Sequence, residues 1–250
     1  MAANALVLAG RTDTDSLRSF TDASSKALVD INGKPMIHYV LTALRQSGRI
    51  GRIVVVGPTQ ELRNSVAEHQ AELLDDGSSI IENIKIGARR LPADERMLIA
   101  TSDIPLLTAP VVDAFLGLCD ARQADLYYPI VEKSVNERKY PLVKRTYVAL
   151  QEGVFTGGNV FVVEPWIVEP VAPKVENFIA NRKNPLALAR LLGPVFILKL
   201  LLKLLTIPEL EAKISSLWGI RGAAVVCPHP EIGIDVDKPS DLQLVRAALK

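Results

Sequence analysis

The chain has 250 residues, 48% of them hydrophobic, and a formal net charge of +1. This length fits one large α/β domain, or one domain with a smaller insert, and the near-zero charge gives no electrostatic support for a nucleic-acid partner. Cys119 and Cys227 lie far apart without a CxxC pattern, so the cysteines predict neither a disulfide nor a zinc site. The N-terminus does not resemble a signal peptide, and we expect a cytoplasmic protein.

The first 44 residues predict a strand, a loop and a helix. The apolar run over residues 5–9 stops at Gly10, which is typical of a strand buried on both faces. Pro35 suits the first turn of a helix, and apolar residues repeat at helical spacing from Met36 to Leu44. The loop leaves the carboxyl end of the strand, where open α/β sheets bind ligands. Gly10 lets the backbone approach a phosphate, and Lys26 can bring a positive charge to it.

The next segments predict a parallel sheet. Residues 52–57 are typical of a second buried strand and residues 60–71 of a helix, which implies right-handed crossovers. A turn over residues 75–79 leads into a helix over 80–91, with Ser79 as its N-cap. A buried strand over 97–100 is followed by Asp103, at the ligand-binding edge of the sheet, where Mg2+ needs carboxylate oxygens. The alternative is that Asp103 caps the helix starting near Thr108, although Thr108 is better placed for that role.

The second half contains two more polar motifs beside strands. Residues 125–131 predict a strand, and residues 144–150 alternate like an edge or antiparallel strand. Gly157 and Gly158 precede a strand ending at Val163, and the Asn159 side chain offers both a donor and an acceptor. After a strand over 223–227, Asp235-Val-Asp237 leads into a final helix; one of these aspartates must point away if the segment is extended.

Between these motifs, residues 165–218 are rich in Leu and Pro. They predict short helices near 174–181, 185–192, 194–205 and 207–217, the last of which begins with a capping box at Thr206. Residues 186–206 are long enough for a membrane span, but three charged residues and Gly193-Pro194 argue against one. Two interpretations remain. The helices pack on the sheet, on each other or on the second subunit of a homodimer; or they make peripheral membrane contact, with Lys199 and Lys203 facing anionic head groups. We expect the first, with the leucines mostly buried.

Six motifs together resemble the MobA-like NTP transferase family: Leu8-Ala9-Gly10, Lys26-Ala27-Leu28, Gly33-Lys34-Pro35-Met36-Ile37, Ser102-Asp103-Ile104-Pro105, the stretch from Phe155 to Val163, and the stretch from Asp235 to Leu242. The resemblance implies an α/β fold of the GT-A-like nucleotidyltransferase type, with a Rossmann-like, open, mostly parallel sheet flanked by helices. We divide the chain into a core over 1–164, a Leu-rich helical insert over 165–220 and a return to the core over 221–250.

The resemblance also implies an activity: Mg2+-dependent transfer of a nucleoside monophosphate from an NTP to a small phosphorylated acceptor, with release of pyrophosphate. It assigns catalytic roles to Lys26 and Asp103. It assigns the metal ligands to Asp103 and Asp237, with Asp235 as the alternative to Asp237. The nucleotide would be bound by Leu8, Ala9, Gly10, Arg11, Lys26, Gly77 and Ser78. The acceptor would be bound by Gly157, Gly158 and Asn159, under the charged region 133–145. None of the three histidines (His38, His69 and His229) needs a role in this reaction.

Two other functions stay open. A glycosyltransferase could use Asp235-Val-Asp237 as its metal motif, although such enzymes place this motif mid-chain and do not need Gly33-Lys34-Pro35. A non-catalytic nucleotide-binding protein is suggested by the glycine-poor, acidic loop over residues 11–18. The sequence identifies neither the acceptor nor the base.

Overall fold

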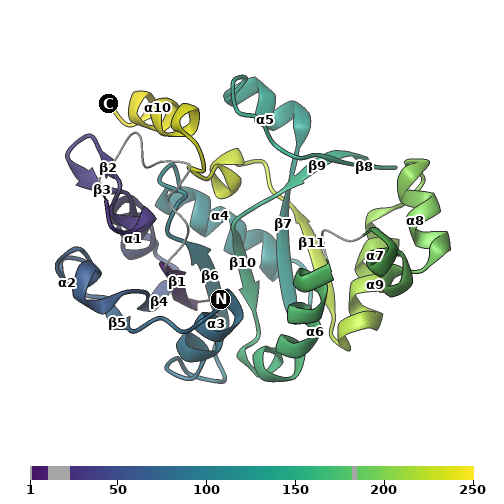
Figure 1. The fold of residues 1–250 in the computed structure, drawn as a ribbon, viewed down its shortest axis with the longest axis horizontal. Helices are drawn as coiled ribbons and strands as arrows, with labels where there is room; N and C mark the ends of the chain where they lie inside the picture. The colour runs from purple at the N-terminus through teal and green to yellow at the C-terminus, as the bar shows by residue number, and fades with distance from the viewer. Residues whose placement is uncertain (1, 11–22, 182–184) are drawn as a thin grey trace.

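The structure is a computed structural model, and it describes residues 2–10, 23–181 and 185–250. Within these residues nine strands form one sheet in the order β5-β4-β1-β6-β10-β7-β9-β8, with β11 paired to β7 (Figure 1). The strands are β1 (Ala3–Leu8), β4 (Ile50–Val56), β5 (Glu72–Leu74), β6 (Met97–Thr101), β7 (Leu126–Glu132), β8 (Val148–Leu150), β9 (Gly153–Gly157), β10 (Val160–Val163) and β11 (Gly222–Val226). A separate hairpin joins β2 (Asp30–Ile31) and β3 (Lys34–Pro35).

The centre of the sheet is parallel. β1 pairs in parallel with β4 and β6, and all six of its residues are buried, which confirms the first predicted strand. β10 inserts antiparallel between β6 and β7, and β9 and β8 extend the sheet in antiparallel pairs. The predicted Rossmann-like, mostly parallel α/β sheet is therefore confirmed, with its antiparallel strands beyond β6.

Helices cover both faces of the sheet (Figure 1). Side chains of α1, α2 and α4 join one core cluster, and those of α3 and α6 join the cluster on the opposite face. Their bounds are α1 (Met36–Gln46), α2 (Thr59–Ala67), α3 (Ile80–Ala88), α4 (Ala109–Asp120) and α6 (Val168–Asn181). The apolar residues predicted to line α1 are all buried, because their helical spacing puts them on one side. α6 lies within the predicted insert, yet it packs against α3 and the sheet.

Further helices, some of them short 3-10 helices, complete the described part of the fold. They are η1 (Lys26–Leu28), α5 (Lys133–Lys139), η2 (Pro165–Ile167), α7 (Pro185–Leu192), α8 (Pro194–Leu201), α9 (Ile207–Trp218), η3 (Pro230–Gly233) and α10 (Pro239–Ala248). A third apolar cluster, which includes Val29, Leu106, Val236 and Leu242, packs η1 against the chain before α10. The backbone N–H of Val236 donates to the carbonyl of Asp103 at 3.0 Å. This packing brings three distant parts of the sequence to one edge of the sheet.

Several predicted elements differ from the structure in their bounds; the helix expected over 60–71, for example, ends at Ala67. Residues 144–150 were expected to form one strand, but only Val148–Leu150 does, because the chain around Arg145 instead turns toward Asp235. The helix expected over 194–205 ends at Leu201, and Lys203 has a φ of 59°, which an α-helix does not accept. By contrast, Ser79 accepts a hydrogen bond from the N–H of Glu82 as an N-cap, and Thr206 forms the predicted capping box.

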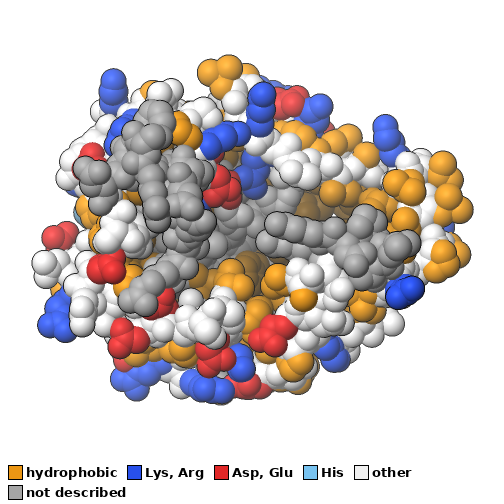
Figure 2. Space-filling view, in the orientation of Figure 1, with side chains coloured by type: hydrophobic (Ala, Val, Ile, Leu, Met, Phe, Trp, Pro, Cys, Tyr) orange, Lys and Arg blue, Asp and Glu red, His pale blue; other side chains and the backbone are white. Residues whose placement is uncertain are grey.

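The leucine-rich insert is less buried than expected. α8 has no buried residue: Leu198 is 57% exposed and Leu201 73%, and hydrophobic side chains gather over α8 in Figure 2. α8 is therefore not buried within the single chain, and burial of its leucines against a second subunit stays a prediction. The reason for this exposure is geometric, since only one side of α8, including Phe196 and Leu200, reaches the core cluster around Ile130. In the described part of the chain, no helix combines the length and apolar character needed to cross a membrane.

Candidate active site

Lys26 lies between two aspartates at the carboxyl edge of the sheet. Its Nζ is 2.5 Å from Asp103 Oδ2 and 2.5 Å from Asp237 Oδ1. Lys26 starts η1, Asp103 follows β6, and Asp237 precedes α10, so these groups come from three separate parts of the sequence. Asp103 does not cap a helix, because the N-cap of α4 is Thr108. The structure therefore brings together the three charged residues that the sequence selected.

The environment keeps the Lys26 ammonium charged. Burial alone would lower the pKa of Lys26, but the carboxylates of Asp103 and Asp237 outweigh it, so the pKa lies above its usual value. Asp103 is only partly exposed, and its Oδ1 is buried with no hydrogen-bond partner among the described residues. A buried carboxylate oxygen without a partner is costly, which marks this atom as a candidate ligand atom.

Asp235 is the third carboxylate of the cluster. Carboxylate oxygens of Asp103, Asp235 and Asp237 lie within 4.8 Å of one another. Burial, together with the charges of Asp237 and Asp103, raises the pKa of Asp235, while Arg145 and a hydrogen bond from Asn159 act against this. The expectation that Asp235 or Asp237 points away is wrong, because this segment is not a strand and both carboxylates reach the cluster.

A cavity of about 290 Å³ opens on one side of this cluster. Its described lining residues are Leu8, Gly10, Lys26, Asp76, Gly77, Ser78, Ser79, Ile80, Asn83, Thr101, Ser102 and Asp103. Most residues predicted to bind the nucleotide therefore lie at one cavity, which we call the first cavity. Ala9 does not line it, because its methyl group is buried in the core. Arg11 lies outside the described residues.

Asn83 is a residue of the first cavity that the sequence did not reveal. It is buried on α3, and its Oδ1 accepts a hydrogen bond from the N–H of Gly77 at 2.7 Å. A Cβ atom at Gly10 would lie 2.5 Å from Asn83 Nδ2, so a larger residue there would displace this amide. Asn83 thus connects the Gly10 loop to the Gly77 loop. A single polar residue in an amphipathic helix gives no sequence signal for this role.

A second cavity of about 390 Å³ lies on the Asp235 and Asp237 side of the cluster. Its lining is mostly polar and consists of Tyr128, Lys144, Arg145, Thr146, Thr156, Gly157, Asn159, Asp235, Asp237, Lys238 and Asp241. Gly157 and Asn159, two of the residues predicted to bind the acceptor, therefore line this cavity. Gly158 does not line this second cavity; a Cβ there would be 2.9 Å from Pro129 and 3.1 Å from the Ile232 carbonyl, so it allows two chain segments to pack closely.

Positive charges at the second cavity come partly from the region predicted to cover the acceptor. Arg145 forms an ion pair with Asp235 and donates from Nη2 to the Gly157 carbonyl at 3.2 Å. Tyr128 also lines an apolar groove of about 260 Å³ between α3 and α6. The Tyr128 ring therefore separates a polar cavity from an apolar one. The sequence did not select Tyr128 or Arg145 individually, because their positions depend on how β7 and the following loops fold back.

Comparison with known proteins identifies the family. Residues 5–190 match the model of the MobA-like NTP transferase domain. The chain belongs to the MobA-like NTP transferase family. No curated protein matches the sequence.

Solved structures resemble this MobA-like protein over nearly its whole length. A hypothetical transferase from Thermus thermophilus is 39% identical, with a TM-score of 0.85 over 97% of this chain and 100% of that chain. CMP:2-keto-3-deoxy-manno-octonic acid synthetase, solved with CTP, is 14% identical, with a TM-score of 0.63 over 100% and 98%. A 4-diphosphocytidyl-2C-methyl-D-erythritol synthase from Anaerococcus prevotii is 8% identical, with a TM-score of 0.61 over 99% and 98%. At these two lower identities, the likeness shows a shared fold.

The residues of this MobA-like protein fit a hard divalent cation such as Mg2+. Three carboxylates lie close together, and such cations take oxygen ligands. The unpartnered Oδ1 of Asp103 is a suitable ligand atom. Asp235 forms an ion pair with Arg145, Asp103 and Asp237 form theirs with Lys26, and the Asp237 side chain is 65% exposed.

Proposed function

We propose that this protein is a nucleotidyltransferase that moves a nucleoside monophosphate from an NTP to a phosphorylated acceptor. An oxygen of the acceptor phosphate attacks the α-phosphorus of the NTP. The bond between this phosphorus and the oxygen that bridges to the β-phosphate breaks, and pyrophosphate leaves. A phosphate is an adequate nucleophile, so no covalent enzyme intermediate is needed. Catalysis then consists mainly of positioning two anions and neutralising them.

One observation carries the proposal: the Lys26–Asp103–Asp237 cluster lies between two separate cavities. Lys26 and Asp103 line the first cavity, and Asp237 lines the second. A reaction between two bound substrates needs such an arrangement, because the reacting atoms must meet at one point. We assign the nucleotide to the first cavity, which Gly10 and Gly77 help to line, and the acceptor to the second.

Each charged group then has a separate role. Lys26 stays protonated and binds phosphate oxygens of the NTP, with Arg11 as a further candidate. Asp103 and Asp237 would hold Mg2+, which when bound lowers the negative charge on the phosphates around the reacting phosphorus. Asp235 keeps Arg145 in place through their ion pair. This division explains why one cluster contains three carboxylates but needs only two of them for the ion.

The second cavity supports an anionic acceptor. Lys144, Arg145 and Lys238 offer cations to a phosphate, although the same lining holds the carboxylates of Asp235, Asp237 and Asp241. Gly157 and Asn159 give backbone access and an amide that hydrogen-bonds. The adjoining apolar groove leaves room beside Tyr128 for a non-polar part of an acceptor. We therefore include phosphates of sugars, of polyols and of molecules with an apolar body among the acceptors to be tested.

The test is a pyrophosphate-release assay of four NTPs against this set of acceptors. We expect pyrophosphate only when one NTP, one acceptor and Mg2+ are all present, together with a product that contains the nucleotide and acceptor. NTP binding without turnover on any acceptor would support a non-catalytic binding protein. Transfer of sugar from a nucleotide-sugar, without pyrophosphate, would support a glycosyltransferase. Either of these results would overturn the proposed reaction.

We also propose that α8 contributes to a homodimer rather than to a membrane contact. Its exposed leucines favour burial, and Lys199 already forms an ion pair with Glu209 and does not need an anionic head group. Sedimentation velocity should show a dimer that dissociates in Leu198→Glu. A monomeric wild type that binds anionic vesicles in a flotation assay would instead favour the membrane interpretation.

A further inference from the structure

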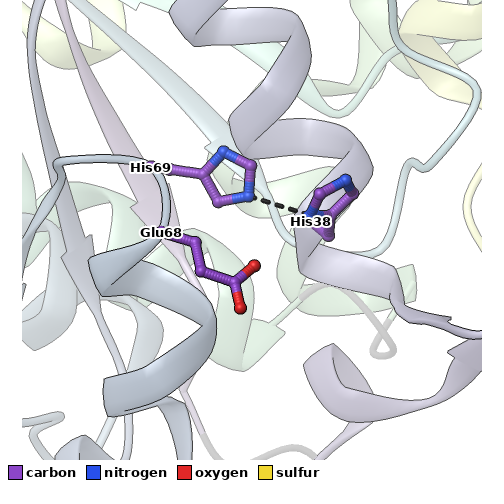
Figure 3. Close-up of side chains that lie close together, drawn as sticks. All are labelled: His38, Glu68 and His69. Atoms are coloured by element: carbon purple, nitrogen blue, oxygen red, sulfur yellow. Dashed lines mark hydrogen bonds between the residues drawn. The ribbon is translucent and has the colours of Figure 1, made fainter.

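A second group of potential metal ligands lies outside the two cavities. His38 is in the first turn of α1, and Glu68 and His69 directly follow α2. One ligand atom of each residue lies within 4.8 Å of those of the other two (Figure 3). His69 Nε2 is 3.0 Å from His38 Nδ1, and the two rings meet edge to face. None of the three residues lines the first or the second cavity.

The chemistry of this group differs from that of the aspartate cluster. Two imidazoles and one carboxylate form a ligand set of Zn2+ sites that leave one position for water. Imidazole nitrogens suit Zn2+ and similar transition-metal ions, whereas Mg2+ prefers oxygen ligands. The cysteine spacing excludes only a cysteine-based zinc site, and both cysteines are buried elsewhere. The histidines were given no role from the sequence because they are distant from each other along the chain.

The protonation state of the histidines also suits a metal. Burial, helped by the charge of Lys34, lowers the pKa of His38; burial, helped by His38, Arg45 and Lys34, lowers that of His69. The carboxylate of Glu68 acts in the opposite direction on both. Both rings are therefore neutral at pH 7, as metal ligands must be. The nearby cations oppose a metal ion as well, so the Glu68 charge is needed to offset them.

The distances match the known geometry of such sites. Zn–N bonds of about 2.0–2.1 Å in a tetrahedral site place two ligand nitrogens roughly 3.3 Å apart. The observed nitrogen pair at 3.0 Å is close to this separation, although the same distance also fits a hydrogen bond between the rings. Glu68 adds a carboxylate as a third ligand for an ion, and the effect of its removal on metal binding separates the two cases.

We propose that His38, Glu68 and His69 bind one divalent transition-metal ion of the Zn2+ type. The ion would replace the hydrogen bond between the rings and connect the first turn of α1 to the chain after α2. Because α1 follows the Lys34–Pro35 hairpin strand, the ion would also fix the start of this helix. The site is independent of the proposed nucleotidyl transfer, since none of its residues lies at the reacting cluster.

The experiment measures Zn2+ binding to the full-length chain after treatment with a chelator, by equilibrium dialysis and with Co2+ as a spectroscopic probe. Wild type should bind about one ion per chain, with Co2+ visible bands of a site containing nitrogen ligands. His38→Ala and His69→Ala should lose this ion. Glu68→Gln should bind at least about tenfold more weakly, a loss comparable to that of a perturbed ligand shell. Millimolar Mg2+ should not compete.

The matched control is His229→Ala, which removes the third histidine of the chain but no ligand of the site. It should bind Zn2+ like wild type. Because Glu68 is exposed, Glu68→Gln is expected to fold even if a histidine variant does not, and circular dichroism checks each variant. Absence of stoichiometric Zn2+ binding by wild type would overturn the proposal. Equal binding by wild type, Glu68→Gln and His69→Ala would do so too.

Discussion

The exchange Asp103→Asn tests the reacting cluster most directly. It keeps the size of the side chain and removes one negative charge. In the structure Asp103 uses one oxygen to contact Lys26 at 2.5 Å, and its other oxygen is buried without a partner among the described residues. The exchange thus removes one of the two carboxylates proposed to hold Mg2+. It also removes the larger of the two charge interactions that raise the pKa of Lys26.

The expected loss of kcat is about a hundredfold or more, or roughly 2.7 kcal/mol of transition-state stabilisation, which is typical when one preorganised electrostatic group is removed. The effect on NTP affinity should be much smaller, because Lys26 keeps its contact with Asp237 and gains freedom to bind phosphate. The free energy of unfolding should change by only about 1 kcal/mol, since one partly buried hydrogen bond is weakened.

The assay is steady-state pyrophosphate release at saturating NTP, acceptor and Mg2+, with the melting temperature measured in parallel. Asp120→Asn is the control, because Asp120 is paired with Arg49 and Arg96 and lines neither the first nor the second cavity. It should keep the wild-type rate. A rate of Asp103→Asn within a few-fold of wild type, at saturating Mg2+, would refute the assignment of Asp103.

Three further predictions use the same assays. Lys26→Ala should impair turnover and Lys26→Arg should not fully restore it, because a planar guanidinium addresses phosphate differently from an ammonium; an unchanged NTP affinity and rate in Lys26→Ala would refute its role. Asp237→Ala should raise the Mg2+ concentration needed for half-maximal rate more than Asp235→Ala does, and the reverse order in a Mg2+ titration would move the ligand role to Asp235. Burial lowers the pKa values of His38 and His69 in the folded chain. Below about pH 6.5 the unfolded chain therefore binds more protons than the folded chain, and the free energy of unfolding should fall as the pH is lowered through this value. Urea unfolding of wild type and His69→Asn, compared at pH 7.5 and 5.5, should show a smaller fall in the variant, and an equal fall would contradict the prediction.

Much of the fold could be predicted because local sequence patterns set it. β1 is apolar from Ala5 to Leu8, as a strand buried on both faces requires, and α1 has apolar residues at helical spacing after Pro35. The caps at Ser79 and Thr206 were also predictable, since a cap depends on residues only a few positions apart. The leucines of α8 were not predictable in the same way, because hydrophobicity does not say whether a partner surface exists.

The candidate site likewise has features that local sequence patterns predict and features that they do not. By itself the sequence determined which charged residues to expect at the candidate site, because Lys26, Asp103 and Asp237 lie in recognisable motifs near predicted strand ends. Only the tertiary structure decided their neighbours. The contact of Lys26 with Asp237 spans 211 positions, and the ion pair of Arg145 with Asp235 spans 90. Such pairs form because apolar packing and crossing strands bring distant segments together, and no local pattern encodes that proximity. For the same reason the sequence did not reveal the pairing of His38 with His69. These residues form the proposed metal site only because α1 packs against the end of α2.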